Sequence, residues 1–205
     1  MTGNATSTAA VLNPQHVGYD KSLQNPYPYN LEKARQLLKE ANFPFDRPLR
    51  LVTYTGSIQN PRALVEAVAG FLSKVGIKTN INVYTDIGMW DRLGREGKQN
   101  DCSIHSWGSG GVYDADALYY NYFRNGQAFC YGSSPDMDNW LDQARSTMNV
   151  EMRNKLYYQA GKYINDQALA VSFWAQNAIL GINKRVIYEA PADEFLRTFE
   201  AKLKE

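Results

Sequence analysis

The stretch Asp101-Cys-Ser-Ile-His-Ser-Trp-Gly-Ser-Gly-Gly-Val-Tyr-Asp-Ala-Asp-Ala117 decides how the surrounding chain is interpreted. It begins as a short buried strand, Cys102–Ser106, and continues through an indole, a cluster of glycines and two acids. A strand end, flexible backbone amides, an aromatic face and carboxylates therefore lie within a few residues of one another. Ligand sites need these components close together, so we expect this stretch to form one wall of a binding cleft.

Strands and helices alternate in the chain before this stretch. The segment Leu49–Tyr54 is rich in β-forming residues, and Thr79–Tyr84 alternates with the period of two that is typical of a half-buried strand. Between them, residues 60–76 predict a helix with proline at its first position and glycine after its end. A second helix, from Asp86, leads to the strand at Cys102–Ser106. The alternation is typical of βαβ units, so the fold class is α/β.

Helices dominate the chain after this stretch. The spacing of apolar residues predicts three of them, which begin near Ala115, Ser134 and Asn149. Two short apolar runs, Ala170–Trp174 and Ile179–Ile182, predict strands. The tail from Asp193 places Phe and Leu among charged residues, so it can form an amphipathic helix.

The ends of the chain differ from its middle. Residues 1–29 are small or polar, contain three prolines and show no period, which indicates an extended connector. Asn30 can cap the first clear helix. We therefore divide the sequence into a connector at residues 1–29, an α/β region at residues 30–187 and a tail at residues 188–205.

Composition excludes several classes of protein. The 205 residues are 44% hydrophobic, enough for a sizeable core, and the net charge of +1 gives no electrostatic case for nucleic acid. No apolar run approaches the ~20 residues that span a bilayer, and Met1–Ala10 has no signal-peptide pattern. Cys102 and Cys130 can form one disulfide or remain two thiols.

Metal and phosphate motifs are absent from the sequence. His16 and His105 lie far apart, without ligand spacing, so we predict no metal and no cofactor. The glycine cluster lacks the Gly-Lys-Ser/Thr ending of a phosphate loop. A nucleophile elbow around Ser109 would need glycine where Trp107 stands. A small hydrolase using Ser109 with His105 therefore remains only as an alternative.

The acids Asp114 and Asp116 are two residues apart, so their side chains would splay on a helix or turn instead of sharing one proton. Paired-carboxylate catalysis needs convergent groups. One of the two acids can instead cap the helix that follows, beside a ligand site. No catalytic constellation is predicted, and we expect a protein that is not an enzyme.

Five motifs in sequence order resemble one known family. They lie at residues 30–38, 72–78, 101–108, 131–145 and 173–186. The first resembles the family's Glu-Lys-Ala-Lys-x-Leu-Leu signature, the second its Leu-x-Lys-Val/Ile-Gly-Ile, and the third its Asp-x-x-x-x-x-Trp-Gly strand end. The family is that of the oligopeptide/dipeptide-binding extracellular solute-binding proteins of ABC importers, family 5.

The resemblance implies a periplasmic-binding-protein type II-like lobe, with a mixed sheet flanked by helices. Family chains are much longer, so residues 30–187 are expected to be the C-terminal ligand-binding lobe with hinge-return strands. Residues 1–29 would then cross over from an N-terminal lobe outside this sequence. The implied function is capture of a small solute in the interlobe cleft and delivery to a membrane permease. The implied location is periplasmic or extracytoplasmic, with a lipid anchor as one option.

The resemblance also defines the candidate ligand-binding residues. They lie on both sides of the glycine cluster: His105, Trp107, Gly108, Ser109, Gly110, Tyr113, Asp114 and Asp116. In peptide-binding members an aspartate three residues after the tryptophan pairs with the peptide's amino terminus, and here that position is Gly110. Asp114 or Asp116 can replace the lost carboxylate, or the ligand can be an opine, an oligosaccharide or another peptide-like solute without a free α-amine. A non-catalytic scaffolding domain is a further alternative.

Overall fold

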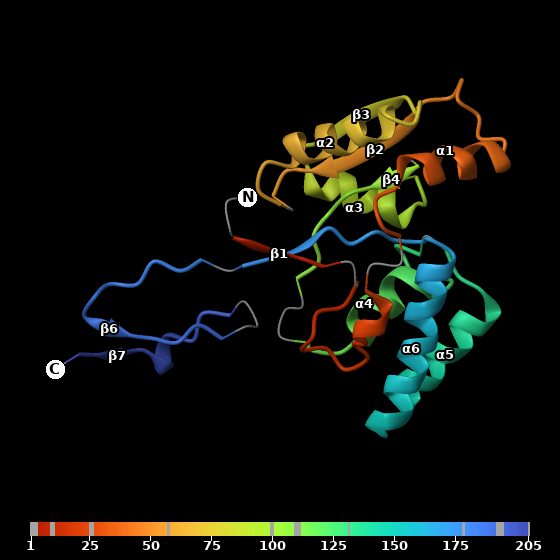
Figure 1. Ribbon diagram of the computed structural model, residues 1–205. Helices are drawn as coiled ribbons and strands as arrows, with labels where there is room; N and C mark the ends of the chain where they lie inside the picture. Colours follow the sequence, from red (N-terminus) through yellow and green to blue (C-terminus); the bar gives the residue numbers. More distant parts are fainter. Residues whose placement is uncertain are drawn as a thin grey trace. The chain divides into compact units, whose positions relative to one another are not determined.

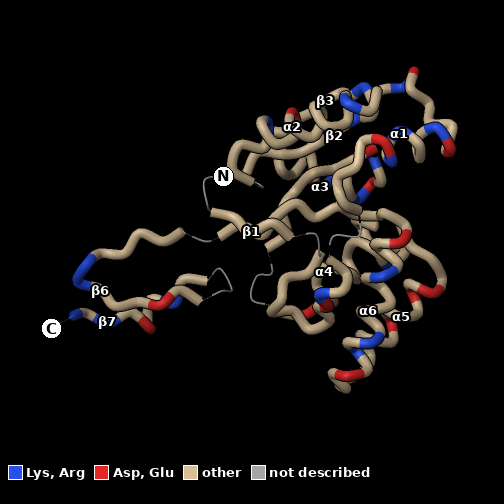
Figure 2. Tube along the Cα trace, in the orientation of Figure 1, with Lys and Arg blue, Asp and Glu red and all other residues tan. Residues whose placement is uncertain are grey.

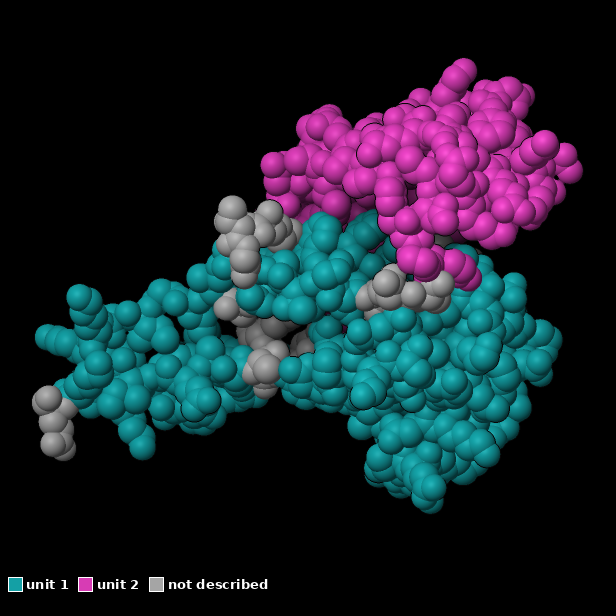
Figure 3. Space-filling view, viewed as in Figure 1, with its two compact units in different colours: residues 1–26, 108–205 teal, residues 27–107 magenta. Residues whose placement is uncertain are grey.

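The computed structural model describes residues 4–8, 11–24, 27–56, 58–98, 101–108, 112–130, 132–177, 179–191 and 195–204. The chain forms two compact units (Figure 3). Unit 1 consists of residues 1–26 and 108–205, and unit 2 of residues 27–107. The chain passes from unit 2 to unit 1 at the Trp107–Gly108 peptide bond. This boundary lies inside the stretch that the sequence singled out for ligand binding.

Unit 2 contains the predicted strand–helix alternation (Figure 1). Its elements are α1 (Leu31–Glu40), β2 (Leu49–Tyr54), α2 (Pro61–Ser73), β3 (Thr79–Tyr84), α3 (Ile87–Arg95) and β4 (Cys102–Ser103). The strands form one parallel sheet in the order β3-β2-β4. The α/β class is confirmed, although β4 is shorter than the predicted Cys102–Ser106.

Helices α2 and α3 cover opposite faces of this sheet (Figure 1). Leu51 of β2 packs in a cluster with Val65 of α2. Tyr54 points to the other face, because side chains alternate along a strand, and its ring lies 4.4 Å from the ring of Trp90 in α3. The parallel order therefore brings the C-terminal ends of β2 and β4 together at one edge of a three-layer unit.

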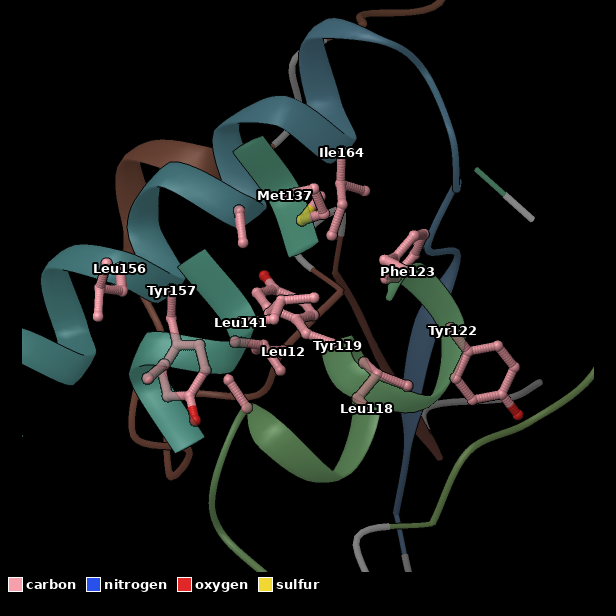
Figure 4. Close-up of a cluster of buried hydrophobic side chains, with 13 residues drawn as sticks. Leu12, Leu118, Tyr119, Tyr122, Phe123, Met137, Leu141, Leu156, Tyr157 and Ile164 are labelled. Carbon is pink, nitrogen blue, oxygen red and sulfur yellow. The ribbon is translucent and has the colours of Figure 1, made fainter. Parts of the chain in front are cut away.

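Unit 1 is built on three helices: α4 (Asp116–Phe123), α5 (Pro135–Ser146) and α6 (Val150–Asp166). Ser134 caps α5 by accepting from the amide of Met137 (3.1 Å), and Asn149 caps α6, as predicted. Buried side chains of all three helices form the core (Figure 4); the larger ones are Leu118, Tyr119, Tyr122, Phe123, Met137, Leu141, Leu156, Tyr157 and Ile164. The core fixes the start of α4, where the candidate acids lie.

The N-terminal segment packs into unit 1. Strand β1 (Ala5–Ser7) pairs antiparallel with β5 (Trp174–Gln176), and a 3-10 turn, η1 (Lys21–Leu23), follows further on. Leu12 is only 3% exposed and belongs to the same core as α4–α6. The described part of residues 4–24 thus combines strand β1, turns and η1, and the C-terminal half of the chain holds it in place.

Three predictions for the C-terminal region differ from the structure. Of the predicted strand Ala170–Trp174, only Trp174 lies in a strand, β5. Residues 179–182 are not a strand; the pair that follows is β6 (Val186–Ile187) with β7 (Lys202–Leu203). The described tail, residues 195–204, contains a 3-10 turn, η2 (Thr198–Glu200), and β7 instead of an α-helix. Antiparallel pairing uses backbone groups that a helix would bond internally, for example in the 2.8 Å bond from the Lys204 amide to the Arg185 carbonyl.

Charged residues of both signs are interspersed along both units (Figure 2). Within the described residues, no helix is long and apolar enough to cross a bilayer. Both cysteines are free thiols: Cys102 belongs to unit 2 and Cys130 to unit 1.

Candidate ligand-binding site

The strand that leads to the site is fixed at its start by Asp101. Its carboxylate accepts from Arg47 Nη1 (3.0 and 3.1 Å) and from the backbone amide of Arg50 (2.8 Å). The bond from the Arg50 amide is the main reason why the pKa of Asp101 falls to about 2. Asp101 thus ties β4 to the start of β2, and the Ile104 amide continues the ladder by donating to the Val52 carbonyl (2.8 Å).

His105 lies in an aromatic cluster in unit 2. Its ring is 5.3 Å from that of Trp90, which also packs on Tyr54. Burial lowers the pKa of His105 to about 4, so the imidazole is neutral at physiological pH. A neutral, packed imidazole two residues after β4 supports the backbone that leads to Trp107.

Trp107 follows two residues later and is 41% exposed. A large aromatic side chain in this position presents an apolar face with a polar N–H at its edge. In parallel α/β sheets, ligands bind outside the carboxyl ends of the strands. Trp107 is therefore the candidate with the most accessible contact surface in unit 2.

The glycine cluster itself falls largely outside the described residues. Ser109 and Gly110 are among the residues whose structure is not described, and Gly108 is exposed. The alternative that uses Ser109 as a nucleophile therefore has no geometric support here.

Tyr113 begins the part of the site that belongs to unit 1. Its carbonyl accepts from the Val17 amide (2.9 Å), and the Ala115 amide donates to the Val17 carbonyl (3.0 Å). The ring of Tyr113 meets the ring of His16 edge-on, with centroids 5.9 Å apart. The candidate segment is thus paired with His16 and Val17 of the N-terminal segment, a contact that the sequence did not indicate.

Asp114 is bonded to helix α6. Its Oδ2 accepts from Arg153 Nη2, and its Oδ1 accepts from the hydroxyl of Tyr157 (3.0 Å). Oδ1 also accepts from the amide of Asp116 (2.9 Å), the first residue of α4. The predicted N-cap was wrong, because Ala115 and neither acid is the N-cap of α4, and it makes no side-chain cap hydrogen bond. Asp114 instead bonds the amide of the first helical residue from the position before the N-cap.

Asp116 is bonded to helix α5. Arg145 donates to both of its carboxylate oxygens (3.0 and 2.7 Å), and the same guanidinium lies 3.3 Å from the centroid of the Tyr120 ring. Bidentate pairing holds a carboxylate in a fixed orientation. The two acids therefore turn towards different helices, as the expected splay requires.

The described candidates fall into two groups. His105 and Trp107 belong to unit 2, whereas Gly108 and the two acids with Tyr113 belong to unit 1. The partners Arg145, Arg153 and Tyr157 were missed by sequence reasoning. Within the described part of the chain, no cluster of His, Cys, Asp and Glu side chains could hold a metal ion.

The family model described as "Bacterial extracellular solute-binding proteins, family 5 Middle" matches residues 1–130. The chain belongs to this family. Family members bind solutes and are not enzymes, which agrees with the prediction that this chain has no catalytic role.

Individual relatives agree with the family assignment. The chain is 29% identical over 163 residues to di/tripeptide-binding protein 2 of Pseudomonas aeruginosa, covering 75% of this chain and 30% of the relative. It is 31% identical over 176 residues to heme-binding protein A of Haemophilus influenzae, covering 81% of this chain and 31% of the relative. The chain thus spans about a third of the length of these curated relatives.

A solved structure confirms the fold. The periplasmic binding protein DppA of Helicobacter pylori, solved with the peptide STSA, superimposes with a TM-score of 0.81 at 23% identity, covering 100% of this chain and 40% of that protein. The periplasmic-binding-protein type of fold implied by the sequence resemblance is therefore correct.

Proposed function

We propose that this chain is the C-terminal ligand-binding lobe of an ABC-importer receptor. The receptor captures a small peptide-like solute outside the cytoplasm, between this lobe and an N-terminal lobe, and delivers it to a membrane permease. The family match supports the receptor class. The exposed indole of Trp107, four residues after the end of parallel strand β4, is the observation that carries the placement of the ligand.

The side chains Trp107 and Tyr113 are proposed as the contacts that stack on the ligand. Each is aromatic, and each stands at one end of the glycine cluster. Aromatic rings offer apolar area at little conformational cost and keep a polar edge for hydrogen bonding. Gly108, Ser109 and Gly110 would let the backbone approach the ligand closely, because they carry little or no side chain.

The ligand that this lobe binds is proposed to lack a free α-amine. Gly110 stands where peptide-binding members carry an amine-binding aspartate. The two nearby acids are compensated by arginines, Asp114 by Arg153 and Asp116 by Arg145. A carboxylate that already neutralises a guanidinium gains less from a second cation. This supports an N-blocked peptide, an opine or an oligosaccharide over an ordinary peptide.

The test uses a two-lobed receptor, in which this chain is joined to the N-terminal lobe so that the protein reaches the length of a family member. Its ligands come from a fixed panel of solutes. The panel contains Ala-Phe, N-acetyl-Ala-Phe, octopine and maltotriose, and isothermal titration measures each affinity. Blocking the amine is expected to leave peptide affinity unchanged within about threefold, or the solutes without a primary α-amine bind best. Loss of affinity by a hundredfold on N-acetylation would contradict the proposed ligand class. No binding to any member would contradict the receptor assignment.

A further inference from the structure

The acid Asp114 sits in a small polar network between three parts of unit 1. Tyr157 is 0% exposed, and its hydroxyl donates to Asp114 Oδ1 at 3.0 Å and accepts from Arg153 Nη2 at 3.1 Å. Arg153 also pairs with Asp114 Oδ2. Burial raises the pKa of Tyr157 to about 12, so the phenol keeps the proton that it donates. Each of the three side chains is therefore hydrogen-bonded to the other two.

The network is more enclosed than the neighbouring ion pair. The side chains of Arg153 and Asp114 are 20% and 18% exposed, whereas those of Arg145 and Asp116 are 47% and 25% exposed. Solvent and salt screen an enclosed pair less than an exposed one. The Asp114 network is therefore the stronger of the two restraints on the start of α4.

Helix α6 also contacts the N-terminal segment. Asn154, the residue after Arg153, accepts at its Oδ1 a hydrogen bond from the amide of Gly18 (2.8 Å). Gly18 has φ of +95°, and a Cβ atom there would lie 2.8 Å from the Tyr157 side chain. Backbone and phenol are in close contact at this point, so residues 16–18 and residues 113–116 are positioned by one helix.

Asp114 lies three residues after the last glycine of the cluster. Glycine restricts the backbone less than other residues do, so residues 113–116 need restraints of their own if Tyr113 is to meet a ligand in one orientation. The bonds of Val17 to Tyr113 and Ala115 provide the backbone part of this restraint, and Asp114 provides the side-chain part. We propose that Arg153 and Tyr157 are positioning residues that hold Asp114, and through it the segment of residues 113–116, in its ligand-binding conformation.

This inference rests on the proposed function, because it assigns a role to that same site. Its test combines local backbone opening in the 205-residue chain with ligand affinity in the two-lobed receptor. Tyr157→Phe removes only the hydroxyl. Tyr119→Phe is the matched control, because its ring lies in the same core, 6.3 Å from that of Tyr157, and no hydrogen bond joins it to Asp114.

Amide hydrogen exchange by NMR is the first measurement. Tyr157→Phe is expected to speed exchange at Val17, Ala115 and Asp116 roughly tenfold, while the amides in the middle of α5 keep their rates. The same change on an Asp114→Asn background is expected to add less than twofold, because both substitutions break one network. Tyr119→Phe leaves the three amides unchanged.

Affinity is the second measurement, with the panel solute that binds the parent receptor most tightly. Tyr157→Phe and Arg153→Lys are expected to weaken binding roughly three- to tenfold, and Tyr119→Phe to leave it unchanged. Unchanged exchange at the three amides would overturn the positioning role whatever the affinity. Faster exchange with unchanged affinity would overturn its link to binding and leave the receptor assignment intact. A parent receptor that binds no panel solute refutes the proposed function, and this inference with it.

Discussion

The hydroxyl of Tyr157 donates a hydrogen bond of 3.0 Å to Asp114 Oδ1, although 43 positions separate the two residues in the chain. Asp114 follows the glycine cluster, and Tyr157 lies in the middle of α6. The bond therefore joins the end of the candidate ligand segment to the core of unit 1. It makes the conformation of that segment dependent on the helical core.

The two acids are expected to differ in their effect on stability. Asp114→Asn should lower the free energy of unfolding by about 2 kcal/mol, because it weakens an enclosed network and leaves Arg153 poorly compensated. Asp116→Asn should cost about 0.5–1 kcal/mol, because its partner Arg145 is nearly half exposed. Urea unfolding of the two variants measures the difference; a larger cost at Asp116 would contradict it.

Gly18 is predicted to be intolerant of a side chain. Gly18→Ala combines a φ of +95° with contacts of 2.8 Å to Tyr157 and 2.9 Å to Ala115, so we expect a loss of about 2–4 kcal/mol in unfolding free energy. Gly56→Ala is the matched control, since Gly56 has φ of +97° and no atom within 4 Å of a built Cβ. It should cost only about 1 kcal/mol. Equal losses in thermal or urea unfolding would show that crowding at Tyr157 contributes nothing.

Asp101 makes a pH-dependent contribution to stability. Its pKa is about 2 in the folded chain, against the ordinary value of 3.8, so the unfolded chain binds the proton more readily. The contribution, about 1–2 kcal/mol, is fully present above pH 4 to 5 and is lost as the pH falls towards 2. Unfolding free energies of the parent and Asp101→Asn should therefore differ at pH 6 and converge near pH 2. A difference that stays constant with pH would rule this contribution out.

The sequence predicted those parts of the fold that depend on local pattern. Strand β3 was found from the alternation in Thr79–Tyr84, and the start of α5 from Ser134 before a proline. Both sequence patterns reflect interactions between residues that are close together in the chain. The pairing of β1 with β5 was missed, because the bond from the Asn177 amide to the Asn4 carbonyl joins distant segments that are each short and irregular in sequence.

The candidate site was predictable only in part, for the same reason. Trp107 and Tyr113 were singled out because an aromatic at each end of a glycine cluster is visible in the sequence. The partners of Asp114 were not visible, since Arg153 is 39 positions away. The nearest signal is that Arg153 and Tyr157 are four residues apart on a predicted helix, and therefore on one face. That pattern does not say what the face contacts.

Trp107 is the residue at which the proposed receptor function and the proposed ligand position can be tested together. Isothermal titration of the two-lobed receptor with its tightest panel solute should compare the parent with Trp107→Ala and with Phe71→Ala, an exposed aromatic on α2 in the same unit. Trp107→Ala is expected to lower affinity roughly tenfold or more, because the ligand loses a stacking face, and Phe71→Ala to leave it unchanged. Equal affinity of the parent and Trp107→Ala would refute the placement of the ligand at Trp107.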